Sequence, residues 1–387
     1  MNYLEGNSDL ENARLNDEKQ KLDDYAVQNN LDEVEIQIEL NNGNIDRLNA
    51  QLHDIEFTCS EKPQIKHQMV HQTIYGYELE ARRELYIMQV SGNELYSEYS
   101  KLITDMWEKQ VKKTAYELLL DIAVNKNKIT YLESLEEQKE HELNVIRESL
   151  KIGYATESNV ISAEAALEKV RTQKSVCENE SDYLISSYNN SSKKKYEDCY
   201  IEYAEKELSA LDDYMQSFRD NSFYGEYYRK QADIYSGYAE SLGEILLKMD
   251  KDKRGNPLNA YKISEDEQKY YDRVYRYIEN EQKYYENEAA IAENNAVRYE
   301  KSLELYVTET YLNAKSFMAQ HRAKSAEIIL AEKQLEISRS LLELGRITQT
   351  DHMEAQNEVL RLKTEIKEIE TKILKYYYIL DNGVESY

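Results

Sequence analysis

The chain has 387 residues, of which only 2 are proline and 11 are glycine, and 32% are charged. So few helix breakers predict long uninterrupted helices, and so many charges suit helices with solvated faces better than one thick globular core. The net charge of −25 argues against nucleic acid and anionic lipid as partners, because both bind through Lys and Arg. It fits a solvated rod or a cation-attracting surface.

The first half of the chain predicts a long helical hairpin. The first helix runs to about Phe57, and the chain reverses near Pro63. The second helix runs from about Ile65 to Ile152 and ends at Gly153, where a glycine after a Leu-rich run can take the positive φ of a helix C′ residue. Thr156 is then placed to cap the next helix.

The second half repeats this order. A third helix runs from Thr156 to about Met249 and turns at 255–257, a Gly-Asn-Pro sequence. A fourth runs from about Leu258 to Leu344 and turns at Gly345, and a fifth runs from Thr348 to about Leu380. Three short runs of Asn, Ser and Gly predict kinks or loops inside these helices: 91–93, 188–192 and 221–225.

The two halves match at their turns. Gly153 and Gly345 lie 192 residues apart (345 − 153), and the only two prolines, Pro63 and Pro257, lie 194 apart (257 − 63). Matched breakers at matched spacings indicate an internal duplication. We therefore predict an all-α chain of two tandem antiparallel helical hairpins, a first repeat over 1–192 and a second over 193–387, forming one continuous elongated coiled-coil rod.

Apolar residues recur at heptad spacing, which is typical of coiled-coil packing. On the fifth helix one seam steps 4-3-4-3-4-3-4: Ala355, Val359, Leu362, Ile366, Ile369, Ile373, Tyr376 and Leu380. The fourth helix has two seams: Ile328, Ala331, Leu335 and Leu342 in the first, and Leu330, Ile337, Leu341 and Leu344 in the second. Two seams predict two partners, as in a wall of side-by-side helices.

Tyrosine is unusually frequent, with 35 Tyr against 4 Phe. Tyr270, Tyr277 and Tyr284 form one column at seven-residue spacing, and a second column adds Tyr271, Ile278 and Tyr285. Such a column could bind ligands through its rings. The structural interpretation is favoured, because Tyr packs its ring between helices while its hydroxyl stays in water.

No catalytic or cofactor motif is present, so we expect neither enzymatic activity nor a cofactor. His67 and His71 have the spacing of a helical metal pair but lack a third ligand, and we assign no metal site. No stretch approaches the ~20 apolar residues of a membrane span. The start has no signal-peptide pattern, so either the protein stays inside the cell or its true start lies upstream of Met1.

At its turns the sequence resembles the TolC family of outer-membrane efflux proteins. The turns read Leu150-Lys-Ile-Gly-Tyr-Ala-Thr-Glu-Ser-Asn159 and Leu342-Glu-Leu-Gly-Arg-Ile-Thr-Gln-Thr-Asp351. Near the start, Ala26 and Asn30 are similar to the family's opening Ala-x-x-x-Asn motif. The resemblance spans about residues 20 to 381. The family's membrane strands are lacking, because neither proline turn has enough alternating apolar residues, so we expect a TolC-like α-barrel without the membrane β-barrel.

The resemblance implies a homotrimeric helical conduit in the cell envelope whose hairpin tips dock the adaptor protein of an export pump. The matching tip residues are Gly153, Tyr154, Thr156, Gly345, Arg346 and Thr348. In the family, acids just after the second tip line the tunnel mouth, and the matching positions are Asp351 and Glu354. The alternative is that Asp351 only supports the helix start and Glu354 is a solvated residue. A second functional hypothesis is a structural coiled-coil spacer with no transport role.

Overall fold

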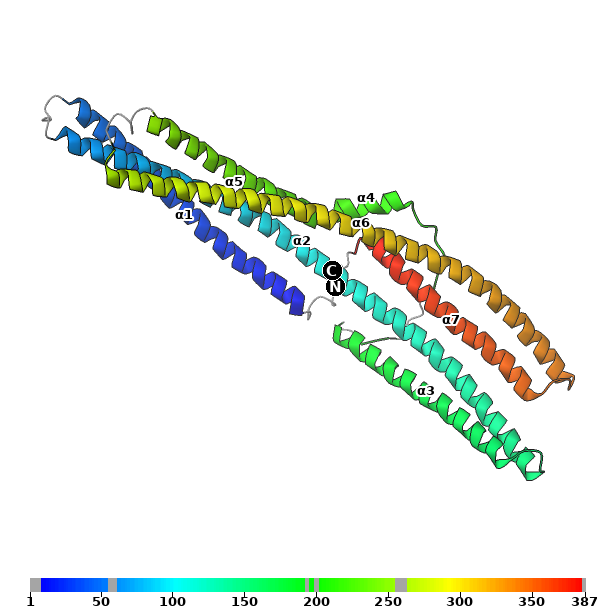
Figure 1. Cartoon of the computed structure of the whole chain (residues 1–387). Helices are drawn as coiled ribbons and strands as arrows, with labels where there is room; N and C mark the ends of the chain where they lie inside the picture. Colours follow the sequence, from blue (N-terminus) through cyan, green and yellow to red (C-terminus); the bar gives the residue numbers. More distant parts are fainter. Residues whose placement is uncertain (1–7, 55–60, 192–194, 198–201, 255–262, 385–387) are drawn as a thin grey trace. The chain divides into compact units, whose positions relative to one another are not determined.

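The computed structural model describes residues 8–54, 61–191, 195–197, 202–254 and 263–384. These ranges contain seven helices and no strand (Figure 1), which confirms the predicted all-α class. The helices are α1 (Ser8–His53), α2 (Lys62–Lys151), α3 (Glu157–Ser191), α4 (Leu211–Asn221), α5 (Phe223–Arg254), α6 (Glu265–Glu343) and α7 (Gln349–Asn382). Within the described ranges, no helix is both long and apolar enough to cross a membrane.

The helices divide between two compact units. Unit 1 is built mainly from Asp105–Arg219 and Leu303–Tyr387, and unit 2 from Asn12–Thr104 and Asp220–Ser302. Helices α2 and α6 contribute residues to both units, and each unit contains segments of both predicted repeats. The predicted repeats, 1–192 and 193–387, describe an internal duplication of the sequence, whereas the two units describe packing. The division at residue 192 therefore stays a prediction.

Unit 1 is a layer of four helices in the order α3, α2, α7, α6 (Figure 1). Side-chain contacts join each neighbouring pair. Arg171 on α3 pairs with Glu136 on α2 at 2.8 Å, Asn357 on α7 donates to Gln138 on α2 at 2.5 Å, and Lys324 on α6 pairs with Glu365 at 3.1 Å. Helices α3 and α6 therefore form the two edges of the layer.

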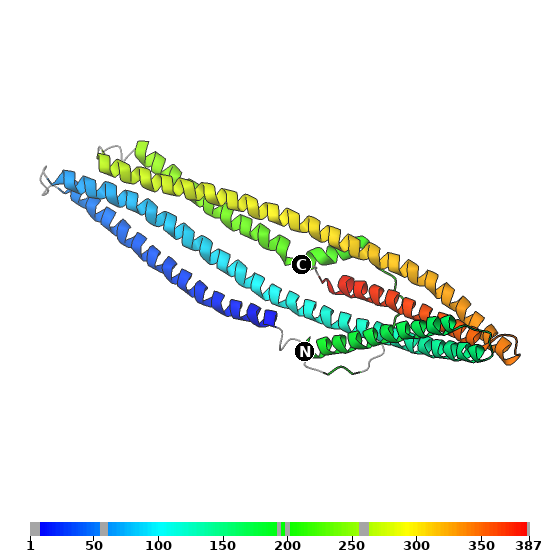
Figure 2. The ribbon, with the colours of Figure 1, turned by 60° about the horizontal axis from the view of Figure 1, so that its bottom comes forward.

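Apolar seams pack the layer together where the sequence predicts them. The seam on α7 is buried or half-buried throughout, with Ile373 fully buried and Leu362 nearly so. The first seam of α6 packs against it, since Ile328, Ala331 and Leu335 cluster with Leu362 and Val359. The connections α2–α3 and α6–α7 lie at the same end of unit 1 (Figures 1 and 2), as predicted.

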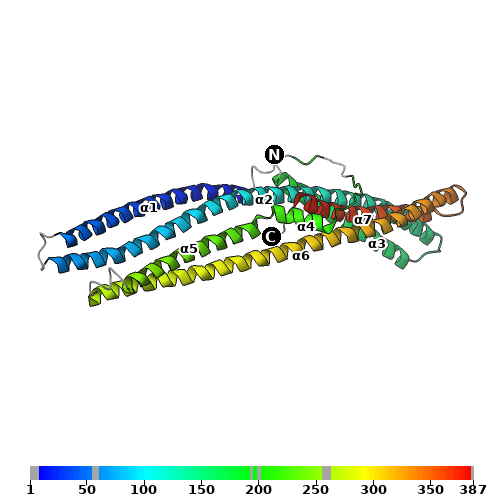
Figure 3. The same cartoon turned by 90° about the horizontal axis from the view of Figure 1, so that it is seen from above.

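Unit 2 is a three-helix bundle of α2, α5 and α6, with α1 lying along α2 (Figures 1 and 3). Its core contains Ile74 from α2, Leu242 from α5 and Ile278 from α6, all fully buried. The column of Tyr271, Ile278 and Tyr285 faces this core, which confirms the structural interpretation of that column. Tyr277 and Tyr284 of the other column are exposed.

The predicted third helix is not one continuous pass. It is divided into α3, a non-helical stretch over 202–210, then α4 and α5. The breaks fall at the predicted runs 188–192 and 221–225. Tyr203 and Leu208 of the stretch pack against Ile373 and Met318, so apolar contacts with α6 and α7 replace the missing helix hydrogen bonds as a source of stability.

Two other predicted features come out differently. The predicted loop at 91–93 does not form, because α2 continues through Gly92 without interruption. Pro63 lies in the first turn of α2, where a missing N–H is tolerated. Phe57, Pro257 and the Gly-Asn-Pro turn lie outside the described residues.

Candidate functional site: the hairpin tips and the edges of unit 1

Both helical hairpins of unit 1 end in the same backbone motif. Gly153 has a φ of 80° and Gly345 a φ of 65°, the left-handed conformation that favours glycine. The residue after each glycine donates its N–H to a carbonyl five positions earlier, at 2.8 Å for Tyr154 to Ser149 and 2.9 Å for Arg346 to Leu341. With the glycine N–H bonds to Leu150 and Leu342, these contacts form two Schellman motifs.

A reciprocal capping box begins the helix after each tip. Asn159 donates its N–H to the Thr156 hydroxyl at 3.3 Å, and its side-chain oxygen accepts the Thr156 N–H at 2.9 Å. Asp351 does the same with Thr348, at 3.2 Å and 2.8 Å. Both tips are therefore held by local hydrogen bonds, as their shared sequence predicts.

The acid of the second tip is engaged in that cap. Hydrogen bonds from the Thr348 side chain and then from its backbone N–H hold the pKa of Asp351 below its usual value. Glu354, three residues later, is exposed. No ion pair joins Arg346 to either acid in the described part of the chain. The geometry thus gives Asp351 a capping role, and an aperture role for the two acids remains a prediction.

The tips present apolar side chains to solvent. Tyr154 is 86% exposed, and Ile152 and Leu344 are also largely exposed. Sequence reasoning selected Tyr154 through its place in the turn motif but missed Ile152 and Leu344 as surface residues. Their exposure could have been predicted from their position next to the turn glycine, because a side chain at a Schellman turn lies beyond the last packed helical turn.

The second seam of α6 lies on the free edge of the layer. Leu330 is 58%, Ile337 59% and Leu344 68% exposed, although they recur at heptad spacing. Leu305 and Leu312 extend the exposed apolar surface along the part of α6 that belongs to unit 1. The sequence predicts two partners for α6; α7 packs on the first seam, while α4 contacts α6 only farther along, at Tyr311 and Tyr306, and leaves Leu330, Ile337 and Leu344 exposed.

The opposite edge also exposes apolar residues. On α3, Ile161, Val176 and Tyr183 are each more than half exposed, while Leu167 and Val170 are buried. Sequence reasoning did not select these outer residues, because polar side chains separate them. Unit 1 therefore has two different edges, each with apolar side chains in water. Exposed apolar rows of this kind are typical of protein contact surfaces.

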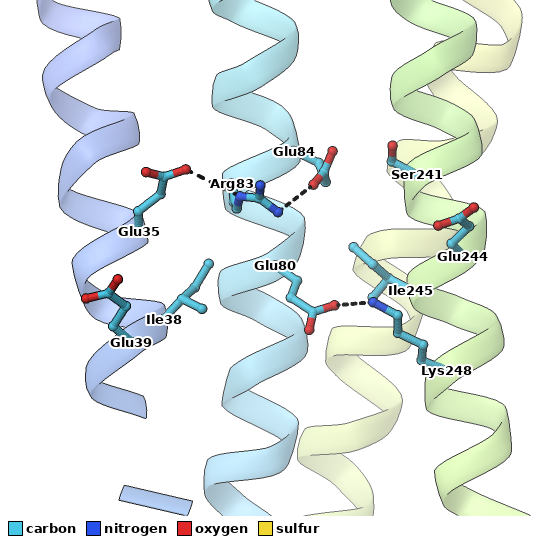
Figure 4. Close-up of a pocket in the computed structure, with 10 residues that line it drawn as sticks. All are labelled: Glu35, Ile38, Glu39, Glu80, Arg83, Glu84, Ser241, Glu244, Ile245 and Lys248. Carbon is cyan, nitrogen blue, oxygen red and sulfur yellow. Dashed lines mark hydrogen bonds and ion pairs between the residues drawn. The ribbon is translucent and has the colours of Figure 1, made fainter. Parts of the chain in front are cut away.

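Unit 2 contains a separate acidic groove of about 460 Å³ between α1, α2 and α5 (Figure 4). Figure 4 shows Arg83 between Glu35 and Glu84, at 3.6 Å and 3.4 Å, and Lys248 at 3.1 Å from Glu80. Glu39 and Glu244 also line the groove. Its excess of carboxylates attracts cations in general, and nothing in it selects one.

The two histidines with metal-pair spacing, His67 and His71, each contact a residue of α6. The Nδ1 atom of His67 lies 3.0 Å from Glu267, and the ring of His71 stacks on Tyr270 with centroids 5.1 Å apart. A search of the described residues finds no group of three or more His, Cys, Asp or Glu side chains placed to hold a metal ion.

Comparison with known proteins identifies the fold. No family model and no curated protein sequence matches the chain. Solved structures do match. The open-state outer membrane channel MtrE of Neisseria gonorrhoeae aligns with a TM-score of 0.57 at 11% identity, over 99% of this chain and 87% of that chain.

Two further channels give similar results. CmeC of Campylobacter jejuni has a TM-score of 0.51 at 12% identity over 77% of this chain and 67% of its own. VceC of Vibrio cholerae has a TM-score of 0.51 at 11% identity, over 79% and 75%. The chain therefore has a TolC-like helical fold, as its turn motifs predicted.

Proposed function

We propose that this chain is the helical conduit subunit of a cell-envelope export system, and that copies of it close into a ring through the edges of unit 1. The observation that carries the proposal is the exposed heptad seam Leu330, Ile337 and Leu344 on α6, opposite an unlike apolar edge on α3. The TolC-like fold and the non-enzymatic, envelope-located channels that share it support the same role.

The two unlike edges favour a ring over a simple dimer. When the edge of one copy packs against the different edge of the next, the contact is head-to-tail, and repeated rotation closes a ring. A seam with leucine and isoleucine at heptad spacing is suited to a second helix. The TolC resemblance gives three copies, each contributing two hairpins.

The tips are the proposed docking surface for the adaptor protein of the pump. Schellman turns and capping boxes hold the backbone of Gly153 and Gly345, so the neighbouring side chains are presented from a rigid base. Tyr154, Ile152 and Leu344 supply exposed apolar area. Arg346, Thr156 and Thr348 add polar groups around it.

The proposed aperture lies just beyond the second tip. In a ring of three, Asp351 and Glu354 would bring six carboxylates around one opening, which would attract cations and repel one another. Substituting Asp351→Asn with Glu354→Gln removes this charge. The cap should survive, because Asn159 already performs the same capping role in the first tip. Changed cation sensitivity or adaptor binding of the oligomer is expected.

The ring is tested by sedimentation. The unmodified chain should sediment as an oligomer, and Ile337→Glu should convert it to a monomer with unchanged helix content, because a carboxylate would be buried in the seam. Gln356→Glu, which adds the same charge at an exposed position on the inner helix α7, is the matched control and should remain oligomeric.

If the unmodified chain sediments as a monomer, the proposed conduit function is wrong. The structural spacer would then take its place. An oligomer that Ile337→Glu leaves intact would show that the α6 seam is not the contact surface.

A further inference from the structure

Helix α1 packs on α2 through a seven-residue repeat that one polar residue interrupts. The positions of the repeat are buried or half-buried, and all but one are aliphatic: Leu31, Val34, Ile38, Asn41, Ile45, Leu48 and Leu52. A helix with such a repeat can shift along its partner by seven residues and still place aliphatic side chains in the seam. The repeat therefore does not fix the position of α1 along α2.

The connection between the two helices does not fix it either. A shift by seven residues moves a helix by about 10 Å along its axis. Residues 54–61 separate α1 from α2, and a chain of that length spans up to roughly 27 Å. Another feature of the seam must therefore select the observed position.

Asn41 lies at the centre of the repeat and makes a specific contact with α2. Its side chain is 4% exposed, and its Nδ2 atom donates to the backbone carbonyl of Gln72 at 3.2 Å. A buried amide that loses its acceptor destabilises the folded chain. The contact therefore favours positions of α1 in which Asn41 reaches a carbonyl.

Gly76 leaves that carbonyl accessible. A Cβ built on Gly76 would lie 3.2 Å from the Asn41 Nδ2 atom, so any other residue at this position would press against the amide. Glycine is unfavourable inside a helix, because it loses more chain entropy on folding than alanine does. The contact with Asn41 accounts for a glycine at this place.

Positions shifted by seven residues lack this arrangement. Met69 and Arg83 stand seven residues before and after Gly76, and both have long side chains. Gly92, the other glycine of α2, lies 16 residues from Gly76 (92 − 76), which is not a multiple of seven. A shift by whole heptads therefore brings Asn41 to no second glycine.

We propose that Asn41 and Gly76 form a register lock, which selects one position of α1 along α2 against positions shifted by seven residues. A single buried asparagine in a heptad seam fixes register at some cost in stability. The same position places Glu35 at 3.6 Å from Arg83 and brings Glu39 to the acidic groove of unit 2. The lock lies within unit 2 and does not depend on the proposed ring.

The first test measures the position of α1 by pulsed electron resonance. Spin labels are attached at Asn30→Cys on α1 and Gln68→Cys on α2, both exposed, in a full chain whose native cysteines are replaced by serine. The labelled chain is diluted with unlabelled chain, so that only distances within one molecule are measured. One distance is expected. Asn41→Leu should add a second distance shifted by up to about 10 Å, because leucine completes the aliphatic repeat.

The matched control is Val34→Leu, which places the same side chain in the same seam and keeps the lock. It should give the single distance of the parent chain. A single unshifted distance in Asn41→Leu overturns the proposal, and so does a second distance in Val34→Leu. Circular dichroism accompanies each measurement, and if Asn41→Leu loses helix, Asn41→Val is measured in its place against the same two outcomes.

The second test concerns the glycine. Gly76→Ala should lower the urea midpoint while Asn41 is present, because the added Cβ presses on the amide. In an Asn41→Ala chain it should raise the midpoint, because the amide is gone and alanine favours the helix more than glycine does. The control is Gly92→Ala, whose Cβ would meet no atom within 4 Å and which should raise the midpoint in both chains. A Gly76→Ala effect of the same sign in both chains overturns the lock.

Discussion

Unit 1 and unit 2 are built from the same kind of helical hairpin, yet they bury their apolar residues differently. In unit 2 one large cluster joins α2, α5 and α6 around Leu242 and Ile278. In unit 1 apolar clusters form around Ile373 and around Leu362, while the row of Leu330 and Ile337 on α6 remains exposed. Unit 2 also exposes single apolar residues such as Leu40 and Leu247, but in unit 1 the exposed residues include a heptad-spaced row along one edge.

This difference separates stability from assembly. Unit 2 has the packed core expected of a self-sufficient domain. Unit 1 is also packed by buried apolar residues such as Ala331, Leu362 and Ile373, but it leaves a further apolar row exposed on α6. We therefore expect substitutions in unit 2 to act on folding and substitutions at the edges of unit 1 to act on association.

The largest contrast is expected between two leucines. Leu242→Ala opens a cavity in the core of unit 2, where the side chain is 0% exposed, and should lower the free energy of unfolding by about 2–5 kcal/mol. Leu330→Ala on the edge of unit 1 should change it by less than about 0.5 kcal/mol in the monomer. Urea unfolding at concentrations where the chain is monomeric measures both. Equal losses would mean that the α6 edge is packed within the single chain.

A second contrast compares two buried asparagines. Asn357→Ala in unit 1 removes the donor to the side-chain oxygen of buried Gln138 and should cost about 1–3 kcal/mol. Asn41→Ala in unit 2 should cost only about 1 kcal/mol, because its partner is the Gln72 carbonyl, which lies inside a helix and keeps its helical hydrogen bond. Asn41 also packs closely on Gly76, where a Cβ would lie 3.2 Å from its Nδ2. Matching losses in urea unfolding would show that Gln138 finds another partner.

The helix caps are where the two units should behave alike. Thr156→Ala and Thr348→Ala each remove a capping hydroxyl in unit 1 and should cost about 1 kcal/mol. Ser264→Ala at the start of α6 in unit 2 should cost about the same, because Ser264 forms the same box with Glu267. Thermal unfolding gives the losses, and Thr348→Ser, which keeps the hydroxyl, is the control. A much larger loss at one tip would indicate contacts beyond the cap.

The smallest effect is a pH dependence that distinguishes the two tips. The Thr348 hydrogen bonds lower the pKa of Asp351, so its stabilising contribution is present above the unfolded pKa of about 4 and is lost as the pH falls through the lower folded value. Asn159 does not titrate. Asp351→Asn should therefore reduce the loss of thermal stability on acidification, and Asn159→Asp should increase it. Unchanged acid profiles for both variants would contradict the capping assignment.

The sequence predicted the features that depend on local chemistry. Gly153 and Gly345 take the positive φ that the turn motif requires, and Thr156 and Thr348 cap the next helices, because these interactions involve only residues close in sequence. The heptad seam of α7 was read correctly for the same reason, since periodicity depends only on helix geometry. The interruption at 188–192 was marked by its polar residues.

Tertiary structure decided which faces find a partner. Periodicity gave α6 two equivalent seams, and only packing shows that the Ala331 seam meets α7 while the Ile337 seam stays exposed. It also showed that the chain does not break at Gly92, because α2 runs through that position without interruption. A sequence pattern specifies the apolar side of a helix, but what lies against that side is set by contacts between residues far apart in the chain.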